Sequence, residues 1–475
     1  MTPPYTSLRQ VQADLRAGAT TCEAIVSGYL AQIDACRQLN IYIEVFAEEA
    51  LQKARELDRR FRENPAEMKR LHGMVISLKD VICYEGHAAT AGSRILSGFQ
   101  SPYSATAVER LLAEDAIIIG RVNCDEFAMG STNETSCYGS TRNAADETRI
   151  PGGSSGASAV SVQAHTCLAS LGSDTGGSVR QPAAFCGVVG MKPTYGRISR
   201  HGLIAYGSSF DQIGTLTHSV EDAALLLEIM AGKDEYDSTA SAKDVAPYSQ
   251  QLQFGRKARV AYFGAALEHP SLASDVKAAC DALIARLRKE GHTVEAVDFE
   301  YLDYIIPAYY VLTTAEASSN LSRFDGVRYG HRSAEAHTLD DLYRKSRTEG
   351  FGAEVQRRIM LGTFVLSAGY YDAYYGKAQR VRRLIHDRTI AILEGYDFIL
   401  LPAAPDGAWK LGETIDDPVA MYLADIFTVQ ANMVGIPAIC LPLGKHADGM
   451  PLGLQLMAGK FCESDLLAFA KLLYA

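Results

Sequence analysis

Two serines in glycine-rich segments are the residues of this chain whose type and setting best suit covalent catalysis. Ser154 lies in the run Gly-Gly-Ser-Ser-Gly at residues 152–156, and Ser178 ends the run Asp-Thr-Gly-Gly-Ser at residues 174–178. Glycines let the backbone approach a reacting group and point several N–H groups at one place. A serine beside such groups can attack a carbonyl carbon while the N–H groups stabilise the oxyanion. The predicted oxyanion hole consists of the backbone amides of Thr175, Gly176, Gly177 and Ser178.

A nucleophilic serine needs a base, and the candidate is Lys79, which ends the apolar run Val75–Leu78. A lysine acts as a base only when it is neutral, so its pKa would have to fall from about 10.4 to about 7–8. A fall of three units corresponds to roughly 4 kcal/mol, which burial can supply. A lysine at the end of a strand is more commonly a solvated charge, so these residues alone leave the assignment open.

Ser154 has a second interpretation. The residues around it fit the pattern Gly-x-Ser-x-Gly of a nucleophile elbow. That motif follows a strand, and Pro151 with Gly152 makes a poor strand end. Ser178 has competing interpretations as well, because a glycine-rich turn can bind phosphate or can simply be a tight turn of the backbone.

Taken together, these segments resemble the amidase signature family. The resemblance rests on the two glycine-serine runs and the upstream lysine in this order, with the two serines 24 residues apart. It extends almost end to end, and within the family the chain closely resembles the glutaminase subunits of tRNA-dependent amidotransferases. The further stretches that carry this similarity are residues 192–200, 208–214 and 318–326.

The resemblance implies a Ser–cisSer–Lys triad made of Ser178, Ser154 and Lys79. Ser154 would relay protons between the lysine and the nucleophile, and the peptide bond before it would be cis. Ser155 is expected to be structural. Ala157 departs from the family's pattern, which commonly has glycine there; alanine favours a helix, so we expect little effect.

Two charged residues flank the nucleophile. We interpret Asp174 and Arg180 as a structural ion pair that braces the loop, and we expect Ser173 and Thr175 to form hydrogen bonds within the same loop.

The resemblance also implies that the substrate is free glutamine. A guanidinium matches its α-carboxylate and a carboxylate matches its α-ammonium group. By resemblance, the glutamine-binding residues of the family correspond to Tyr309, Arg358 and Asp425. The ammonia would pass to a B subunit that activates the glutamate of Glu-tRNA(Gln) with ATP and Mg²⁺, while a small C subunit braces the pair.

Composition fits this division of labour. The 475 residues carry a net charge of −10, so the chain should contact tRNA mainly through the B subunit. There is no Gly-x4-Gly-Lys-[Ser/Thr] loop, so we expect no ATP site of that type and no cofactor in this chain. No metal is predicted, and His331 and His337 are interpreted as surface residues. The ten cysteines show no Cys-x-x-Cys spacing, and we find neither a signal segment nor a membrane span, which predicts a cytoplasmic protein.

Predicted strands alternate with predicted helices along the chain. This order predicts an α/β layered fold in which helices cover both faces of a central mixed, mostly parallel sheet. We expect a single amidase domain over residues 1–475, with a signature core at 65–260 and a mainly helical insert at 300–390 covering the site. Strands are predicted at 75–78, 116–119, 168–171, 259–263, 293–299, 398–401 and 438–441. Helices are predicted after a capping box of Thr20 and Glu23, at 47–63, at 106–114, after Ser154, at 220–230 with Ser219 as the cap, and at 274–290.

Two rival functions stay open at this stage. One is a stand-alone amidase of the same superfamily that hydrolyses another amide, and the other is a non-catalytic scaffold with a decayed site. The intact set of serines and lysine argues against the scaffold. The sequence also leaves open whether the assembly makes Gln-tRNA, Asn-tRNA or both.

Overall fold

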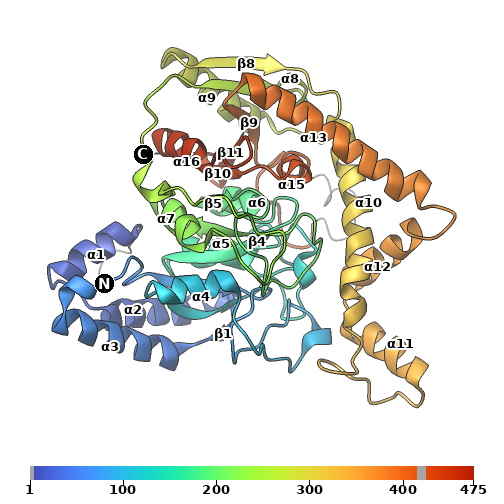
Figure 1. Cartoon of the computed structure of the whole chain (residues 1–475), viewed down its shortest axis with the longest axis horizontal. Helices are drawn as coiled ribbons and strands as arrows, with labels where there is room; N and C mark the ends of the chain where they lie inside the picture. The colour runs from blue at the N-terminus through green and yellow to red at the C-terminus, as the bar shows by residue number, and fades with distance from the viewer. Residues whose placement is uncertain (1–4, 414–423, 475) are drawn as a thin grey trace.

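A sheet of eleven strands organises the protein in the computed structural model, which describes residues 5–413 and 424–474 (Figure 1). The strands follow the order β1-β3-β2-β4-β6-β5-β10-β11-β9-β7-β8 across the sheet. Their bounds are β1 Tyr42–Val45, β2 Val75–Lys79, β3 Ile117–Val122, β4 Ala169–Asp174, β5 Val189–Lys192, β6 Gln212–Thr217, β7 Arg259–Phe263, β8 Thr293–Val297, β9 Phe398–Pro402, β10 Ala438–Lys445 and β11 Pro451–Ala458.

The sheet is mixed, as expected, but the expectation that it is mostly parallel is wrong. Among the described strands, six of the ten pairings are antiparallel. The parallel pairings lie in two separate places, β3-β2-β4 and β9-β7-β8. Between them, β6, β5, β10 and β11 reverse direction at every step. The sequence analysis predicts no strand at β5, β6 or β11. The alternation of strands and helices along the chain therefore indicated only the two parallel parts of the sheet.

Helices cover the sheet on both faces. Every residue of β2, β4 and β6 is buried, and successive side chains of a strand point to opposite faces, so neither face of these strands is open to water. The helices are α1 Leu8–Arg16, α2 Cys22–Ala35, α3 Ala47–Glu63, α4 Thr106–Ala113, α5 Gly156–Gln163, α6 Arg180–Cys186, α7 Val220–Met230, α8 Gly264–Leu267, α9 Ser274–Lys289, α10 Leu302–Asn320, α11 Leu339–Gly350, α12 Ala353–Val365, α13 Lys377–Gly395, α15 Val429–Val434 and α16 Glu463–Leu473.

Local sequence signals set most helix ends, with one correction. α3 spans the predicted residues, and the Ser219 hydroxyl accepts a hydrogen bond from the N–H of Asp222 to cap α7. The predicted capping box at the start of α2 is wrong by one residue, because Thr21 is the N-cap. The Asp58 carboxylate of α3 accepts the next two free N–H groups of α2, so a tertiary contact replaces the reciprocal bond that Glu23 would supply.

Four long helices, α10 to α13, form the predicted helical segment after residue 300. α10, α11 and α12 lie along one side of the molecule, at the right in Figure 1, and α13 crosses above them. α10 and α12 pack very closely at Gly362, where a Cβ atom would overlap the carbonyl group of Thr314. The organisation of the chain as a single domain with a core and an insert stays a prediction. Within the described residues, no helix is long and apolar enough to cross a membrane.

The close approach of α10 and α12 gives a prediction about stability. Gly362→Ala should lower the free energy of unfolding by roughly 1–3 kcal/mol, because the new methyl group pushes against backbone that cannot move alone. Gly28→Ala is the matched control: Gly28 lies in the interior of α2 with nothing within 4 Å of a new Cβ, so alanine there should stabilise by up to about 1 kcal/mol. Urea denaturation of both variants measures the difference, and equal effects would contradict the packing argument.

Candidate active site

Lys79 is the centre of the site. It ends the buried strand β2, its side chain is fully buried, and its Nζ donates to three serine hydroxyls. The Nζ–Oγ distances are 2.7 Å to Ser154, 2.9 Å to Ser155 and 2.9 Å to Ser173. The structure therefore joins two predicted residues and shows that Ser155 and Ser173 also hold the lysine, a contact that the sequence did not reveal.

Burial lowers the pKa of Lys79 to about 8, although the nearby carboxylates of Asp125 and Asp174 act in the opposite direction. About a tenth of the molecules would then have a neutral amine at pH 7. An ammonium group can donate to all three hydroxyls, whereas a neutral amine has one lone pair that accepts a proton from one of them. The geometry thus allows a proton to pass between Ser154 and Lys79.

The segment before Ser154 is held in an unusual conformation. The Gly153–Ser154 peptide bond is cis, as the resemblance implied. The N–H of Gly153 donates to Oε1 of Gln181 at 2.9 Å, and a Cβ atom at residue 153 would overlap the Asp125 carboxylate. Only glycine fits between these groups, so this glycine is required by close packing rather than by a turn.

Ser178 lies at the end of the glycine loop that follows β4, and 9% of its surface is exposed. Its carbonyl accepts the N–H of Ser155 at 3.1 Å, which ties the two serine segments together. Within the described part of the chain, the N–H groups of Thr175, Gly176 and Ser178 have no acceptor. The Gly177 N–H donates to Oδ1 of Asp174 at 2.9 Å, so the structure removes Gly177 from the predicted set of oxyanion donors.

The loop is braced by the ion pair predicted from the sequence. Arg180 and Asp174 are both fully buried and 3.0 Å apart. Burial alone would raise the pKa of Asp174, but the guanidinium outweighs it and holds this pKa at about 2. Arg180 also donates to the carbonyl of Thr428 and to Oδ1 of Asn432, which connects the loop to α15 and the segment before it.

The three residues assigned to glutamine come from separate parts of the chain and lie near this loop. Tyr309 of α10 is buried, and its hydroxyl would be 2.6 Å from a Cβ atom at Gly176. Arg358 of α12 is also buried and donates to the hydroxyl of Tyr206 at 2.8 Å. Burial raises the pKa of both Tyr309 and Asp425, and the Arg358 charge opposes that rise in each, so the three side chains interact electrostatically.

Asp425 is the carboxylate of this group. Burial raises its pKa to about 7, and its Oδ2 accepts the Ser131 hydroxyl at 2.7 Å. Three residues further along, the Thr428 hydroxyl donates to the carbonyl of Gly176 at 2.7 Å. Asp425 is thus fixed relative to the loop that carries Ser178.

The sequence analysis missed two buried carboxylates that position the site. Asp125 accepts the N–H groups of Asn133 and Glu134, at 2.9 Å and 3.1 Å, and so holds the segment that contains Ser131. Asp211 accepts the Thr175 hydroxyl at 2.6 Å, and burial raises the pKa of Asp211 to about 6. Neither has a local signal, because an isolated aspartate shows its role only through groups that are distant in the sequence.

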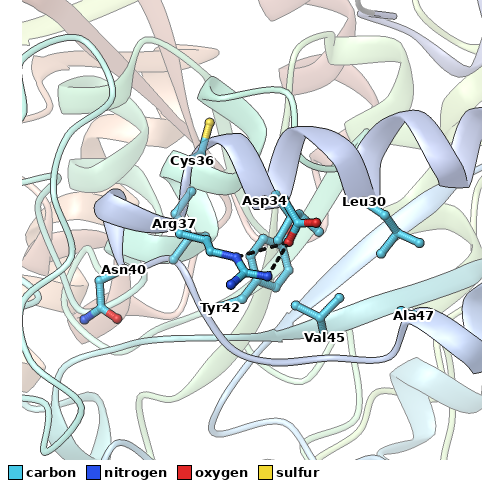
Figure 2. Close-up of a pocket in the computed structure, with 10 residues that line it drawn as sticks. Leu30, Asp34, Cys36, Arg37, Asn40, Tyr42, Val45 and Ala47 are labelled. Carbon is cyan, nitrogen blue, oxygen red and sulfur yellow. Dashed lines mark hydrogen bonds and ion pairs between the residues drawn. The ribbon is translucent and has the colours of Figure 1, made fainter.

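A large cavity lies elsewhere, between the end of α2 and the edge strand β1 (Figure 2). Its volume is about 550 Å³, and Asp34 and Arg37 form an exposed ion pair at its border. None of the predicted site residues lines it.

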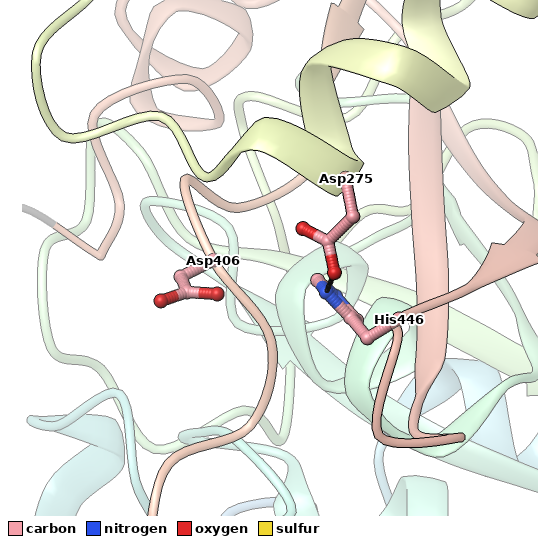
Figure 3. Close-up of side chains that lie close together, drawn as sticks. All are labelled: Asp275, Asp406 and His446. Carbon is pink, nitrogen blue, oxygen red and sulfur yellow. Dashed lines mark hydrogen bonds and ion pairs between the residues drawn. The ribbon is translucent and has the colours of Figure 1, made fainter.

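One group of possible metal ligands occurs among the described residues, and Figure 3 shows it. Asp275, Asp406 and His446 each offer an atom within 4.8 Å of the others. Nδ1 of His446 is already 2.8 Å from the Asp275 carboxylate, and Asp406 is exposed. The three side chains line a separate pocket, and the cation of Arg149 lines it too. The group is remote in sequence from the serine loops, and we assign no metal to it.

Comparisons with known proteins show the family to which the chain belongs. The family model described as amidase matches residues 24–467. The A subunit of glutamyl-tRNA(Gln) amidotransferase from Chlorobium limicola is 51% identical over 471 residues, which is 98% of each chain. The protein of the same name from Koribacter versatilis is 51% identical over 453 residues, which is 95% of this chain and 94% of that one.

A solved structure is similar as well. The crystal structure of the glutamyl-tRNA(Gln) amidotransferase A subunit from Thermotoga maritima is 38% identical in sequence and superposes with a TM-score of 0.78. The match covers 94% of this chain and 90% of that chain.

The burial of Lys79 predicts a pH-dependent stability. Between about pH 8 and pH 10.5 the native state has released the Lys79 proton, whereas the unfolded chain still binds it. The free energy of unfolding therefore rises with pH across this window because of Lys79, by about 3 kcal/mol in total.

Denaturant unfolding of the wild type and of Lys79→Met at several pH values between 7 and 10.5 measures this effect. The wild type should gain about 3 kcal/mol relative to the variant as the pH rises. Lys289→Met, on the exposed face of α9, is the control and should show a constant difference. A constant difference for Lys79→Met would mean that the native lysine stays protonated.

Proposed function

Because this chain belongs to the amidase family, we propose that it is the glutamine-hydrolysing subunit of a glutamyl-tRNA(Gln) amidotransferase. The observation that carries the proposal is the buried Lys79 bonded to Ser154, with the Ser178 loop joined to the same segment. Half of the residues are identical to those of named A subunits along nearly the full length, which supports this function over that of an unrelated amidase.

In the proposed reaction, the Ser178 hydroxyl attacks the side-chain amide carbon of glutamine. Its proton passes through Ser154 to the neutral amine of Lys79. The N–H groups of Thr175, Gly176 and Ser178 stabilise the oxyanion, because they have no acceptor among the described residues and belong to the nucleophile and the loop just before it. The proton then returns through Ser154 to the leaving ammonia, and water hydrolyses the acyl-enzyme to glutamate.

Recognition of glutamine rests on its two α-substituents. Arg358 binds the α-carboxylate, Asp425 binds the α-ammonium group, and Tyr309 closes the pocket beside Gly176. Arg358 and Asp425 are buried, so each forms a charge-assisted contact with little competition from water. Simple amides lack both substituents and would not use these contacts.

The remaining steps belong to partner subunits. A chain with a net charge of −10 and no nucleotide-binding loop is poorly suited to bind tRNA and ATP by itself. We propose that the B subunit binds Glu-tRNA(Gln), ATP and Mg²⁺, that it receives ammonia from this chain, and that a C subunit completes a heterotrimer. All ten cysteines are free thiols, which fits a reducing cytoplasm.

The role of Ser178 can be tested by Ser178→Ala in the assembled complex. Glutaminase activity should fall by several orders of magnitude, because the covalent nucleophile is removed. Amidation driven by added ammonia should survive, because that step does not need this site. Ser158→Ala is the control, since Ser158 is a buried serine of α5 that donates to the carbonyl of Leu171 and not to Lys79. Retention of more than about 1% of glutaminase activity by Ser178→Ala would falsify the assignment.

Substrate recognition gives a separate prediction. Arg358→Gln and Asp425→Asn should each raise the KM for glutamine about 10- to 150-fold, since each removes a contact worth roughly 1.5–3 kcal/mol. Hydrolysis of a simple amide should change much less. Equal losses on both substrates would show that these residues support the fold instead.

The same pocket predicts a pH dependence. The pKa of Asp425 is raised to about 7, so its carboxylate forms as the pH rises through 7. The KM for glutamine should therefore fall between pH 6 and pH 8 in the wild type, and Asp425→Asn should lack this change. A stand-alone amidase for another substrate would show neither the fall in the KM for glutamine with pH nor its loss in Asp425→Asn.

A further inference from the structure

Large hydrophobic side chains are exposed where α12 ends and α13 begins. Of seventeen exposed large hydrophobic residues in the described chain, six fall within residues 360–374. We call these six the aromatic patch: Met360, Leu361, Phe364, Tyr370, Tyr371 and Tyr374. The turn between the two helices projects at the right-hand edge of Figure 1, away from the sheet.

Three of the aromatic rings in the patch pack against one another. The ring of Phe364 lies 4.3 Å from that of Tyr370 and 5.7 Å from that of Tyr374. Met360 remains 66% exposed, and the other five are between 42% and 45% exposed. Six large hydrophobic side chains exposed within fifteen consecutive residues are typical of an interaction site.

Basic side chains border the patch on α13. Lys377, Arg380 and Arg383 are exposed, whereas Asp372 is the one exposed acidic residue between 360 and 384. Arg383 pairs with Asp387, but Lys377 and Arg380 form no ion pair within the described residues. This local positive charge stands out on a chain whose net charge is −10.

We infer that the aromatic patch is the docking surface for another protein subunit, whose facing surface is apolar at its centre and acidic at its rim. The inference rests on the proposed function, which requires a partner to receive the ammonia. Aromatic side chains and arginines are the residue types that dominate protein–protein affinity. The aliphatic side chains of Met360 and Leu361, and the small number of cations, favour a protein over a nucleic acid, since affinity for nucleic acid comes mainly from contacts of lysines and arginines with phosphates.

The patch and the proposed glutamine pocket are connected through α12. Arg358 lies on the buried face of α12, while Leu361 and Phe364 lie on its exposed face within two turns. Gly362 packs α12 directly against Thr314 of α10, the helix that carries Tyr309. A protein docked on the patch therefore presses on the two helices that supply the guanidinium and the tyrosine, and its binding should lower the KM for glutamine.

The test compares the full chain with a double variant, Leu361→Glu with Phe364→Glu, each mixed with the purified remaining subunits of the same amidotransferase. Carboxylates placed against an apolar and acidic partner surface should raise the Kd for assembly about 100-fold or more. The isolated variant should keep its melting temperature and basal glutaminase activity, since neither residue lies in the site. Tyr236→Glu and Tyr304→Glu are matched controls, because these tyrosines are 78% and 57% exposed outside the patch.

Lys377→Glu with Arg380→Glu provides an independent measurement. This pair should weaken assembly and reverse its dependence on salt, because like charges would then face each other. The wild-type complex should show a lower KM for glutamine than the isolated chain, and the patch variants should lose this difference.

The following outcomes would contradict the proposed docking surface. Unchanged assembly of the Leu361→Glu/Phe364→Glu variant would overturn it directly. A change in self-association of this chain alone would assign the patch to a second copy, and a loss of tRNA binding with intact assembly would assign it to nucleic acid. Failure of the proposed function is distinguishable, because the wild-type complex would then lack glutamine-dependent amidation, whatever the patch variants do.

Discussion

The burial of one lysine amine is the constraint on which the rest of the site depends. Lys79 is fully buried, and a buried ammonium without partners would be very unfavourable. Three hydroxyls surround it, from Ser154, Ser155 and Ser173, which requires the segment after residue 150 to pack against the ends of β2 and β4. This arrangement stabilises the lysine enough to keep it in the interior, yet leaves its pKa near 8, where it can gain and lose a proton close to neutral pH.

The Ser178 loop is then held by a second set of buried charges. Asp174 accepts the N–H groups of Gly177 and Val179 and pairs with Arg180, so the carboxylate fixes the backbone on both sides of Ser178. Because buried charges are stable only when their hydrogen bonds are complete, a loop built on them has little freedom to move. The N–H groups of residues 175, 176 and 178, which have no acceptor among the described residues, belong to this braced loop.

The long helices after residue 300 connect this centre to the surface. α10 and α12 each supply one residue of the proposed glutamine pocket and pack together without a gap at Gly362. The exposed face of α12 carries part of the aromatic patch. One helix thus carries a residue of the proposed glutamine pocket and part of the proposed docking surface, which gives a direct physical route from assembly to substrate binding.

The sequence by itself determined the local parts of this protein, such as the helix at 47–63 and the cap at Ser219, because these depend on neighbouring residues. The grouping of Lys79, Ser154 and Ser178 as a candidate triad required a family resemblance as well. Only the tertiary structure decided the direction of the central strands, the loss of Gly177 as an oxyanion donor, and the roles of Asp125 and Asp211. Periodicity and capping patterns describe contacts within a few residues, whereas a buried carboxylate takes whichever N–H groups the folded backbone brings to it.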